Sequence, residues 1–272
     1  MTTTATTLAR DAISDRRVPL GAVKDTLAIA WRNLIAYRRV PQLLVFSTIQ
    51  PVIFVVMFRY VFGGAIKVPG FRYSYVDFLM PGIFVQTVVF GSIATAIGLA
   101  TDMKSGLMER FHALPMARSA VLTGRTMADL SRNVFVVILM SVVGFLVGWR
   151  IHANVLALLA GALLVLLFGY AMSWIFATVG LAVGDPETAQ AAAFPVLAPL
   201  VFASSAFVSP QSMPGWLRVF ANHQPVSVTA QAVRNLTTGM PAAHYVVQAL
   251  AWDVGILVLF APIAVRLYRR AV

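Results

Sequence analysis

Six long stretches of apolar side chains alternate with short polar segments along the chain. The stretches lie at residues 43–62, 78–100, 133–149, 155–182, 190–208 and 245–265. A helix needs roughly 20 mostly apolar residues to cross a hydrocarbon core about 30 Å thick. The pattern therefore predicts an all-α integral membrane protein with six transmembrane helices.

The composition supports this fold class. Apolar residues make up 59% of the 272 residues and charged residues only 11%, which leaves too few charges to cover a soluble enzyme. The two longest segments outside the spans, 1–42 and 209–244, are shorter than the roughly 50 residues of a typical domain. We therefore expect a cytoplasmic N-terminal segment at 1–42, one transmembrane domain at 43–265 and a basic cytoplasmic tail at 266–272.

The distribution of basic residues predicts the orientation. Fifteen of the 21 Lys and Arg lie on the side that holds the N-terminus, five lie on the other side, and Arg59 lies within the first span. Cytoplasmic loops are enriched in Lys and Arg, so both termini are expected in the cytoplasm. The bias also explains the net charge of +11 without nucleic acid as a partner. Seven Lys or Arg and no uninterrupted apolar core precede the first span, so we expect no secretory signal peptide.

Sequence motifs for catalysis are missing. No GxxxxGK[ST] motif occurs, and none of the three lysines (Lys24, Lys67 and Lys104) follows a glycine, so the chain is not expected to hydrolyse ATP. The four histidines show no metal-ligand spacing, and no GxSxG motif is present. We therefore predict no catalytic residue, no metal site and no cofactor bound by this chain.

Residues 20–38 have the spacing of an amphipathic helix that lies in the membrane interface. Apolar side chains recur on one face, and Pro41 ends the segment before the first span. A basic flank that only fixes the topology is the other interpretation. The candidate residues of this segment, which the resemblance described below implies to be a connecting helix, are Leu27, Trp31, Arg32, Leu34, Arg38 and Arg39.

The loop at 101–125 combines an apolar ridge with charge. Leu107, Phe111 and Leu114 share one helical face, and Pro115 ends the turn. Such a short helix fits a groove on a partner protein, or it lies on lipid. The charged side chains around the ridge are Glu109, Arg110 and Arg118.

Two further polar segments have recognisable turn chemistry. At 183–189, Pro186 makes the turn rigid, and Asp185 and Glu187 either cap the next helix or meet basic residues of a partner, of which capping is the commoner role. At 209–243, two short helices are expected. One begins near Pro214 and carries Trp216 and Leu217, and the other follows Pro225 and ends near Gly239.

Asp253 lies inside the sixth predicted span, where an ionisable group is costly and often functional. It either carries a proton or makes an interhelical hydrogen bond to a neighbour such as Gln86 or Thr95. A single acid without a second carboxylate or His in the spans favours the structural role.

The whole chain resembles the permease subunit of type-two ABC exporters of the daunorubicin-resistance kind. The resemblance rests on three segments: MERFHALPMARSAVLTGR, GDPETAQ, and SPQSMPGWLRVFANHQPVSVTAQAVRNLTTG. The last contains P-G-W-L, then Asn222-x-x-Pro225, then an Arg and a Gly before the final span.

The resemblance implies a multi-pass protein of a bacterial cytoplasmic membrane. It implies two six-span subunits, identical or paralogous, that work with separate ATPase subunits which bind ATP and Mg²⁺. The loop from Leu107 to Arg118 would be the helix that couples to the ATPase, and the segment from Pro214 to Pro225 would form outer re-entrant helices. The cargo of such exporters is a hydrophobic drug, a secondary metabolite or a lipid.

Two alternatives stay open from the residues alone. One is a proton-coupled secondary transporter that uses Asp253 as its carrier. The other is a membrane scaffold that transports nothing and recruits a soluble partner through its loops.

Overall fold

The computed structural model describes residues 41–63, 68, 70–107 and 118–270, and the regular structure in these ranges is helical. Four helices are the longest: α4 (Tyr75–Lys104), α6 (Arg118–Val147), α7 (Val155–Val183) and α11 (Ala243–Arg270). The shorter elements are α3 (Pro41–Val56), the π-helix η1 (Met57–Phe62), α8 (Pro186–Phe202), the 3₁₀ turn η2 (Pro210–Ser212), α9 (Gly215–His223) and α10 (Pro225–Thr238).

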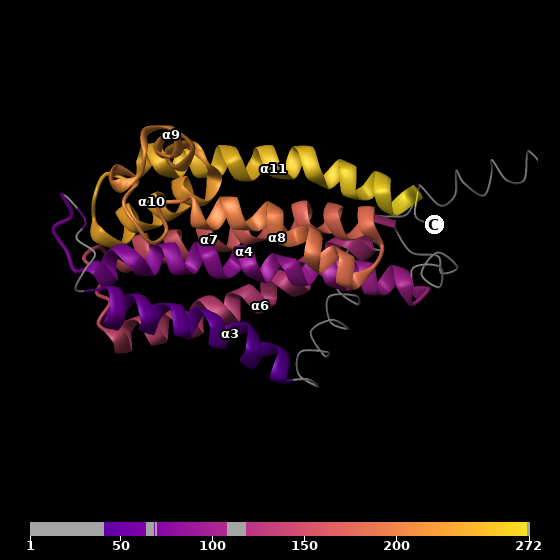
Figure 1. The fold of residues 1–272 in the computed structure, drawn as a ribbon, viewed down its shortest axis with the longest axis horizontal. Helices are drawn as coiled ribbons and strands as arrows, with labels where there is room; N and C mark the ends of the chain where they lie inside the picture. Colours follow the sequence, from indigo (N-terminus) through magenta and orange to yellow (C-terminus); the bar gives the residue numbers. More distant parts are fainter. Residues whose placement is uncertain (1–40, 64–67, 69, 108–117, 271–272) are drawn as a thin grey trace, which may run out of the picture.

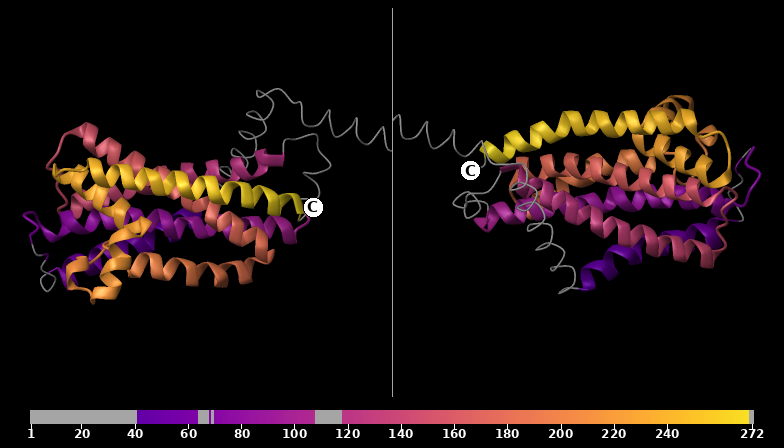
Figure 2. Two further views of the ribbon diagram at one scale, coloured as in Figure 1. Left: turned by 90° about the horizontal axis from the view of Figure 1, so that it is seen from above. Right: turned by 180° about the vertical axis from the view of Figure 1, so that it is seen from behind.

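The long helices run side by side in one elongated bundle (Figure 1). Helices α9 and α10 gather at one end of it, here called the α9–α10 end. The C-terminus of α11 lies at the other end, here called the opposite end, together with the turn between α7 and α8 (Figures 1 and 2).

Helix α4 is the centre of the bundle. It packs against α6, α7, α8 and α10, and 72% of its most apolar stretch is buried, against 17% of the corresponding stretch of α11. Large apolar side chains such as Val247, Val254 and Val258 are exposed along α11. A helix that buries little and exposes apolar side chains is suited to contact with lipid.

Four helices in the described ranges are long and apolar enough to cross a membrane, and α3 with η1 supplies a shorter apolar helix. Helices α4, α7 and α11 coincide with the second, fourth and sixth predicted spans within five residues at each end. Helix α8 ends at Phe202, six residues before the predicted end of the fifth span, because the chain turns at 203–208.

Helix α6 is longer than the third predicted span. It begins at Arg118, 15 residues before the expected start of that span at residue 133, so it includes part of the segment expected to be a cytoplasmic loop. The prediction assigned the charges before residue 133 to a cytoplasmic loop, whereas Asp129 and Arg132 are buried against the bundle.

Close approach of α4 and α7 depends on Gly180. A Cβ atom at this position would overlap the main-chain oxygen of Ala96 on α4. At Gly255 on α11, by contrast, a Cβ atom would meet nothing within 4 Å.

We expect Gly180→Ala to lower the thermal stability of the purified protein, because α4 and α7 must move apart; overpacking of this kind costs about 1–3 kcal/mol. Gly255→Ala is the matched control. Its Tm should be unchanged or slightly higher, because alanine has a higher helix propensity than glycine. Tm values measured in the same detergent check this, and equal Tm values for the two variants would contradict the packing argument.

Candidate functional site

At the opposite end, two ion pairs flank the 107–118 connection. Lys104, at the end of α4, donates a 2.6 Å hydrogen bond to the carboxylate of Asp185 before α8. Asp102 and Arg125 pair across α4 and α6 at 3.8 Å. Both ends of the connection are thus tied to the bundle.

Asp185 is the N-cap of α8, which was the commoner of the two roles expected for it. Its carboxylate accepts hydrogen bonds from the main-chain N–H and the hydroxyl of Thr188, each at 3.0 Å. The hydrogen bond from Lys104, followed by those from Thr188, lowers the pKa of the Asp185 carboxyl to about 2. Pro186 occupies the first turn of α8 and Glu187 is exposed.

Most predicted contacts with a partner ATPase lie outside the described residues. These are Glu109, Arg110, Phe111, Leu114 and Pro115, together with all candidates for the connecting helix, Leu27 to Arg39. Leu107 is half-buried at the end of the described stretch, and Arg118 opens α6.

A buried polar cluster joins α4 to α6, and the sequence analysis missed it. Thr95 donates a 2.6 Å hydrogen bond to Asp129, which lies 4.0 Å from the guanidinium of Arg132. Arg132 donates to the main-chain oxygen of Gly91 at 2.6 Å. The spacing of Arg125, Asp129 and Arg132, at i, i+4 and i+7, was the available signal that they share one helical face.

Beside this cluster is a cleft of about 530 Å³ between α3, α4, α6 and α8. Its walls are mixed in polarity, with side chains such as Phe90, Ile93 and Val136 beside amides and Arg132. Gln86 is only 3% exposed, and its Oε1 has no hydrogen-bond partner among the described residues. The polar side chains that line the cleft are Gln50, Gln86, Thr87, Arg132, Asn133 and Gln190.

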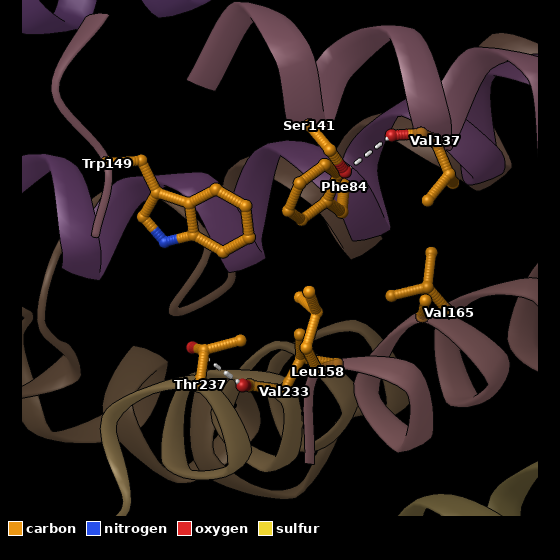
Figure 3. Close-up of a pocket in the computed structure, with 9 residues that line it drawn as sticks. Phe84, Val137, Ser141, Trp149, Leu158, Val165, Val233 and Thr237 are labelled. Carbon is orange, nitrogen blue, oxygen red and sulfur yellow. Dashed lines mark hydrogen bonds between the residues drawn. The ribbon is translucent and has the colours of Figure 1, made fainter. Parts of the chain in front are cut away.

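A second cavity, between α4, α6, α7 and α10, is far smaller. It measures about 20 Å³ and is lined mainly by apolar side chains, including Phe84, Leu158 and Val165 (Figure 3). The hydroxyls of Ser141 and Thr237 donate to main-chain oxygens of their own helices. This space is about that of one water molecule and belongs to the core.

The hydrogen bond predicted between Asp253 and Gln86 or Thr95 is not formed. Asp253 is fully buried on α11, and neither carboxylate oxygen has a hydrogen-bond partner among the described residues. Thr95 bonds to Asp129 instead. The prediction treated all spans as neighbours, whereas α11 packs on α7 and α10 and only weakly on α6.

The two short helices predicted before the last span are present as α9 and α10. Pro214 precedes α9, where Trp216 is exposed and Leu217 half-buried. Pro225 is the first residue of α10, and Gly239 ends that helix with φ +73° in the left-handed region that favours glycine.

Arg234 fastens α10 inside the bundle. The side chain is 1% exposed, and its guanidinium donates to the main-chain oxygens of Phe78 and Ser205 at 3.0 and 2.9 Å. A third hydrogen bond, of 2.6 Å, goes to Gln231, and the guanidinium lies 3.7 Å from the centre of the Phe78 ring. No carboxylate pairs with Arg234 in the described part of the chain.

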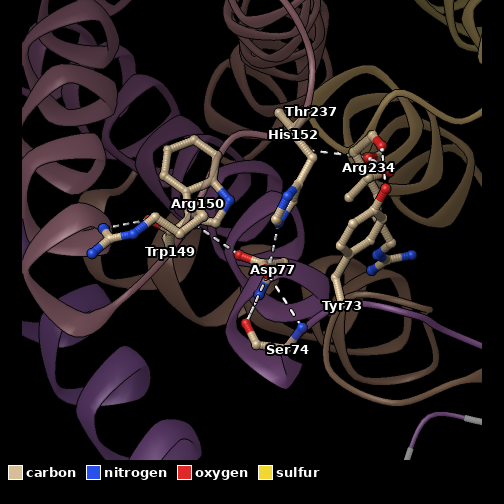
Figure 4. Close-up of polar contacts among 9 residues, drawn as sticks. Tyr73, Ser74, Asp77, Trp149, Arg150, His152, Arg234 and Thr237 are labelled. Atoms are coloured by element: carbon tan, nitrogen blue, oxygen red, sulfur yellow. Dashed lines mark hydrogen bonds and ion pairs between the residues drawn. The ribbon is translucent and has the colours of Figure 1, made fainter.

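The carboxylate of Asp77 is the centre of a second group of polar contacts at the α9–α10 end (Figure 4). Its side chain and that of Ser74 form a capping box at the start of α4. The same carboxylate accepts from the main-chain N–H of Arg150 at 2.8 Å and lies 3.2 Å from the His152 ring. The main-chain N–H of His152 donates to the main-chain oxygen of Thr237 at the end of α10, so three segments meet here.

Comparison with known proteins decides the family. Residues 24–237 match the family described as ABC-2 type transporter. The chain belongs to the ABC-2 type transporter family. It is 36% identical, over 91% of its length and 87% of the relative's, to the daunorubicin resistance ABC transporter permease protein DrrB1 of Streptomyces coeruleorubidus.

Other relatives are similar over most of their length. The chain is 28% identical to the probable doxorubicin resistance ABC transporter permease protein DrrC of Mycobacterium tuberculosis, over 92% of this chain and 90% of that one. It is 22% identical to the putative transport permease ycf38 of Cyanophora paradoxa, over 79% of this chain and 74% of that one.

This ABC-2 chain is therefore a multi-pass membrane protein and the permease subunit of an ABC transporter, not its ATPase. An ATPase partner follows from the family. Because the partner ATPase is then the energy source for transport, the family argues against proton coupling through Asp253.

Substitution of Asp129 and of Asp185 should show that a buried ion pair contributes more to stability than an exposed one. Asp129→Asn removes the carboxylate that lies 4.0 Å from the buried Arg132, and breaking a buried ion pair typically costs about 3 kcal/mol. Asp185→Asn keeps an equally good N-cap and loses only an exposed pair, so it should change stability little. Tm measurements on the two variants check this, and a larger loss for Asp185→Asn would refute it.

Proposed function

We propose that this permease exports hydrophobic or amphipathic compounds, of the kind that includes anthracycline drugs, across the cytoplasmic membrane. The observation that carries the proposal is the 36% identity to a daunorubicin resistance permease over nearly the whole chain. The cleft of mixed polarity beside α4 has a size that suits such a compound, since ligand pockets measure about 300–1,000 Å³.

The proposed membrane topology has six spans, with both termini in the cytoplasm. Helix α3 continues into η1, so the two cover residues 41–62 and make a first span. Helix α8 has 17 residues and reaches about 26 Å, enough for a short fifth span. The α9–α10 end then faces outward, and α9 and α10 are the outer re-entrant helices.

Coupling to the ATPase is assigned to the segment from Leu107 to Arg118. The paired ends of α4, α6 and α8 support this role, because a push on the segment would reach the bundle through Asp102–Arg125 and Lys104–Asp185. ATP and Mg²⁺ are bound by the partner, whose closure switches the permease from inward-facing to outward-facing.

The assembly is proposed to contain a second permease subunit, identical or paralogous. Exposed apolar side chains on several helices, including Ile53 on α3, Phe194 on α8 and Phe220 on α9, provide surface for that subunit and for lipid. The segment around Trp31 to Arg39 is proposed to lie in the inner membrane interface as the connecting helix.

Phe111→Asp combined with Leu114→Asp is expected to abolish co-purification with the partner ATPase and to abolish doxorubicin export. The reason is that a charged ridge would not enter an apolar groove. The control variant, Phe111→Leu with Leu114→Met, keeps the apolar ridge and should still co-purify with the ATPase and export doxorubicin. Undiminished association and export in the Asp variant would rule out this coupling segment.

Gln86→Leu is expected to raise the KM for doxorubicin export at least about fivefold, because one hydrogen bond to the cargo is worth about 1 kcal/mol. Fold stability should not fall, since Gln86 Oε1 has no partner within the described chain. Thr87→Val is the control in the same cleft, because the Thr87 hydroxyl already donates to Ile83 in its own helix. Uptake into inverted vesicles that contain the ATPase gives both KM values, and equal values would argue against this cargo site.

A further inference from the structure

The α9–α10 end contains a cavity that the export proposal does not use. It measures about 480 Å³ and lies between α9, α10, α11 and the segment 205–211. Its polar lining includes Arg218, Asn222, His223, Gln231, His244 and Gln248.

The formal charge in the lining of this cavity is positive. The lining contains Arg218 but no Asp or Glu. Beneath it lies the buried Arg234, whose three hydrogen-bond partners, Phe78, Ser205 and Gln231, all line the cavity. A cation held in a low-dielectric wall without a paired carboxylate focuses positive potential into the adjoining space.

Arg218 is held in place at the rim. Its Nε donates to the main-chain oxygen of Pro210 at 3.2 Å, and its Nη2 donates to those of Gln211 and Met213 at 3.0 and 3.1 Å. None of these bonds uses Nη1. A guanidinium oriented by main-chain oxygens keeps its full charge for an anion, because no carboxylate neutralises it.

The surroundings of the cavity are typical of a membrane interface. On α9, Trp216 is 77% exposed, and on α11, Trp252 is exposed while its indole N–H donates to the main-chain oxygen of His223 at 3.1 Å. Exposed Val247 and Leu250 continue the apolar surface along α11. Tryptophan is enriched at the level of lipid headgroups, with its ring in the apolar layer and its N–H near the polar one.

We propose that this cavity binds the phosphate of an anionic phospholipid headgroup from the outer leaflet, with Arg218, His244 and the Nε2 atom of His223 as its contacts. Nδ1 of His223 already lies 2.8 Å from the main-chain oxygen of Val219. The neighbouring amides of Asn222 and Gln248 suit the hydroxyl groups of a glycerol headgroup. The outer location rests on the topology proposed above. The bound lipid would join α9, α10 and α11 at the point where they meet.

The test is to place the permease with its ATPase in nanodiscs of equal phosphatidylglycerol and phosphatidylcholine and to quantify the lipid that stays bound by native mass spectrometry. The wild type should retain phosphatidylglycerol preferentially. Arg218→Gln should reduce its retention about tenfold, because charge-assisted hydrogen bonds are lost. His244→Ala, which leaves the Arg218 contacts intact, should reduce it in the same direction.

Arg150→Gln is the matched control. Arg150 is also an exposed arginine of this end that donates to main-chain oxygens, those of Phe145 and Trp149, but it lies outside the cavity. Its substitution should leave lipid retention unchanged. Equal losses in the Arg150 and Arg218 variants would show a general charge effect and overturn the proposed site.

Two further measurements identify the anion and separate this proposal from that of drug export. Inorganic phosphate at millimolar concentration should not displace the lipid; displacement together with phosphate binding in detergent would make the ligand a free anion and refute the lipid assignment. Doxorubicin transport is measured in liposomes of the same lipids. A wild type that retains phosphatidylglycerol but moves no drug would refute the export proposal and leave the lipid site standing.

Discussion

The burial of Arg234 is the constraint on which the α9–α10 end depends. A guanidinium without a carboxylate partner is costly in a low-dielectric interior unless oxygen atoms accept its N–H groups. The turn at 203–208 supplies one of them, because Ser205 lies beyond the last turn of α8 and its main-chain oxygen has no place in a helix. The early end of α8 and the position of α10 therefore support each other.

Helix α4 connects this constraint to the other end of the molecule. Near its start it contacts Arg234 through Phe78, in its middle it holds Asp129 through Thr95, and at its end Lys104 pairs with Asp185. Because most of its surface is buried, it cannot shift without repacking its neighbours. A displacement at the opposite end would thus reach the cleft and the α9–α10 end through one rigid element.

Sequence reasoning succeeded where local chemistry decides the structure. The length of apolar runs located α4, α7 and α11, and the turn chemistry of Pro225 and Gly239 located α10. It failed where a charged residue is compensated by distant partners. The burial of Asp129 and Arg132 against the bundle was not predicted, and Arg234 bonds to Phe78, 156 residues away. The neighbours of Asp253 could not be predicted either, because they depend on which helices pack against α11 and not on the place of Asp253 in the sequence.

The two large cavities differ in charge more than in size, and this difference bears on the direction of transport. The cleft beside α4 contains amides, and its Arg132 lies within 4.0 Å of Asp129, so the local charge is close to balanced. The cavity at the α9–α10 end has basic residues and no acid. A cationic amphiphile therefore meets unfavourable electrostatics as it nears the α9–α10 end, where an anionic headgroup would offset them. If that end faces outward, a bound lipid would govern how readily such cargo leaves.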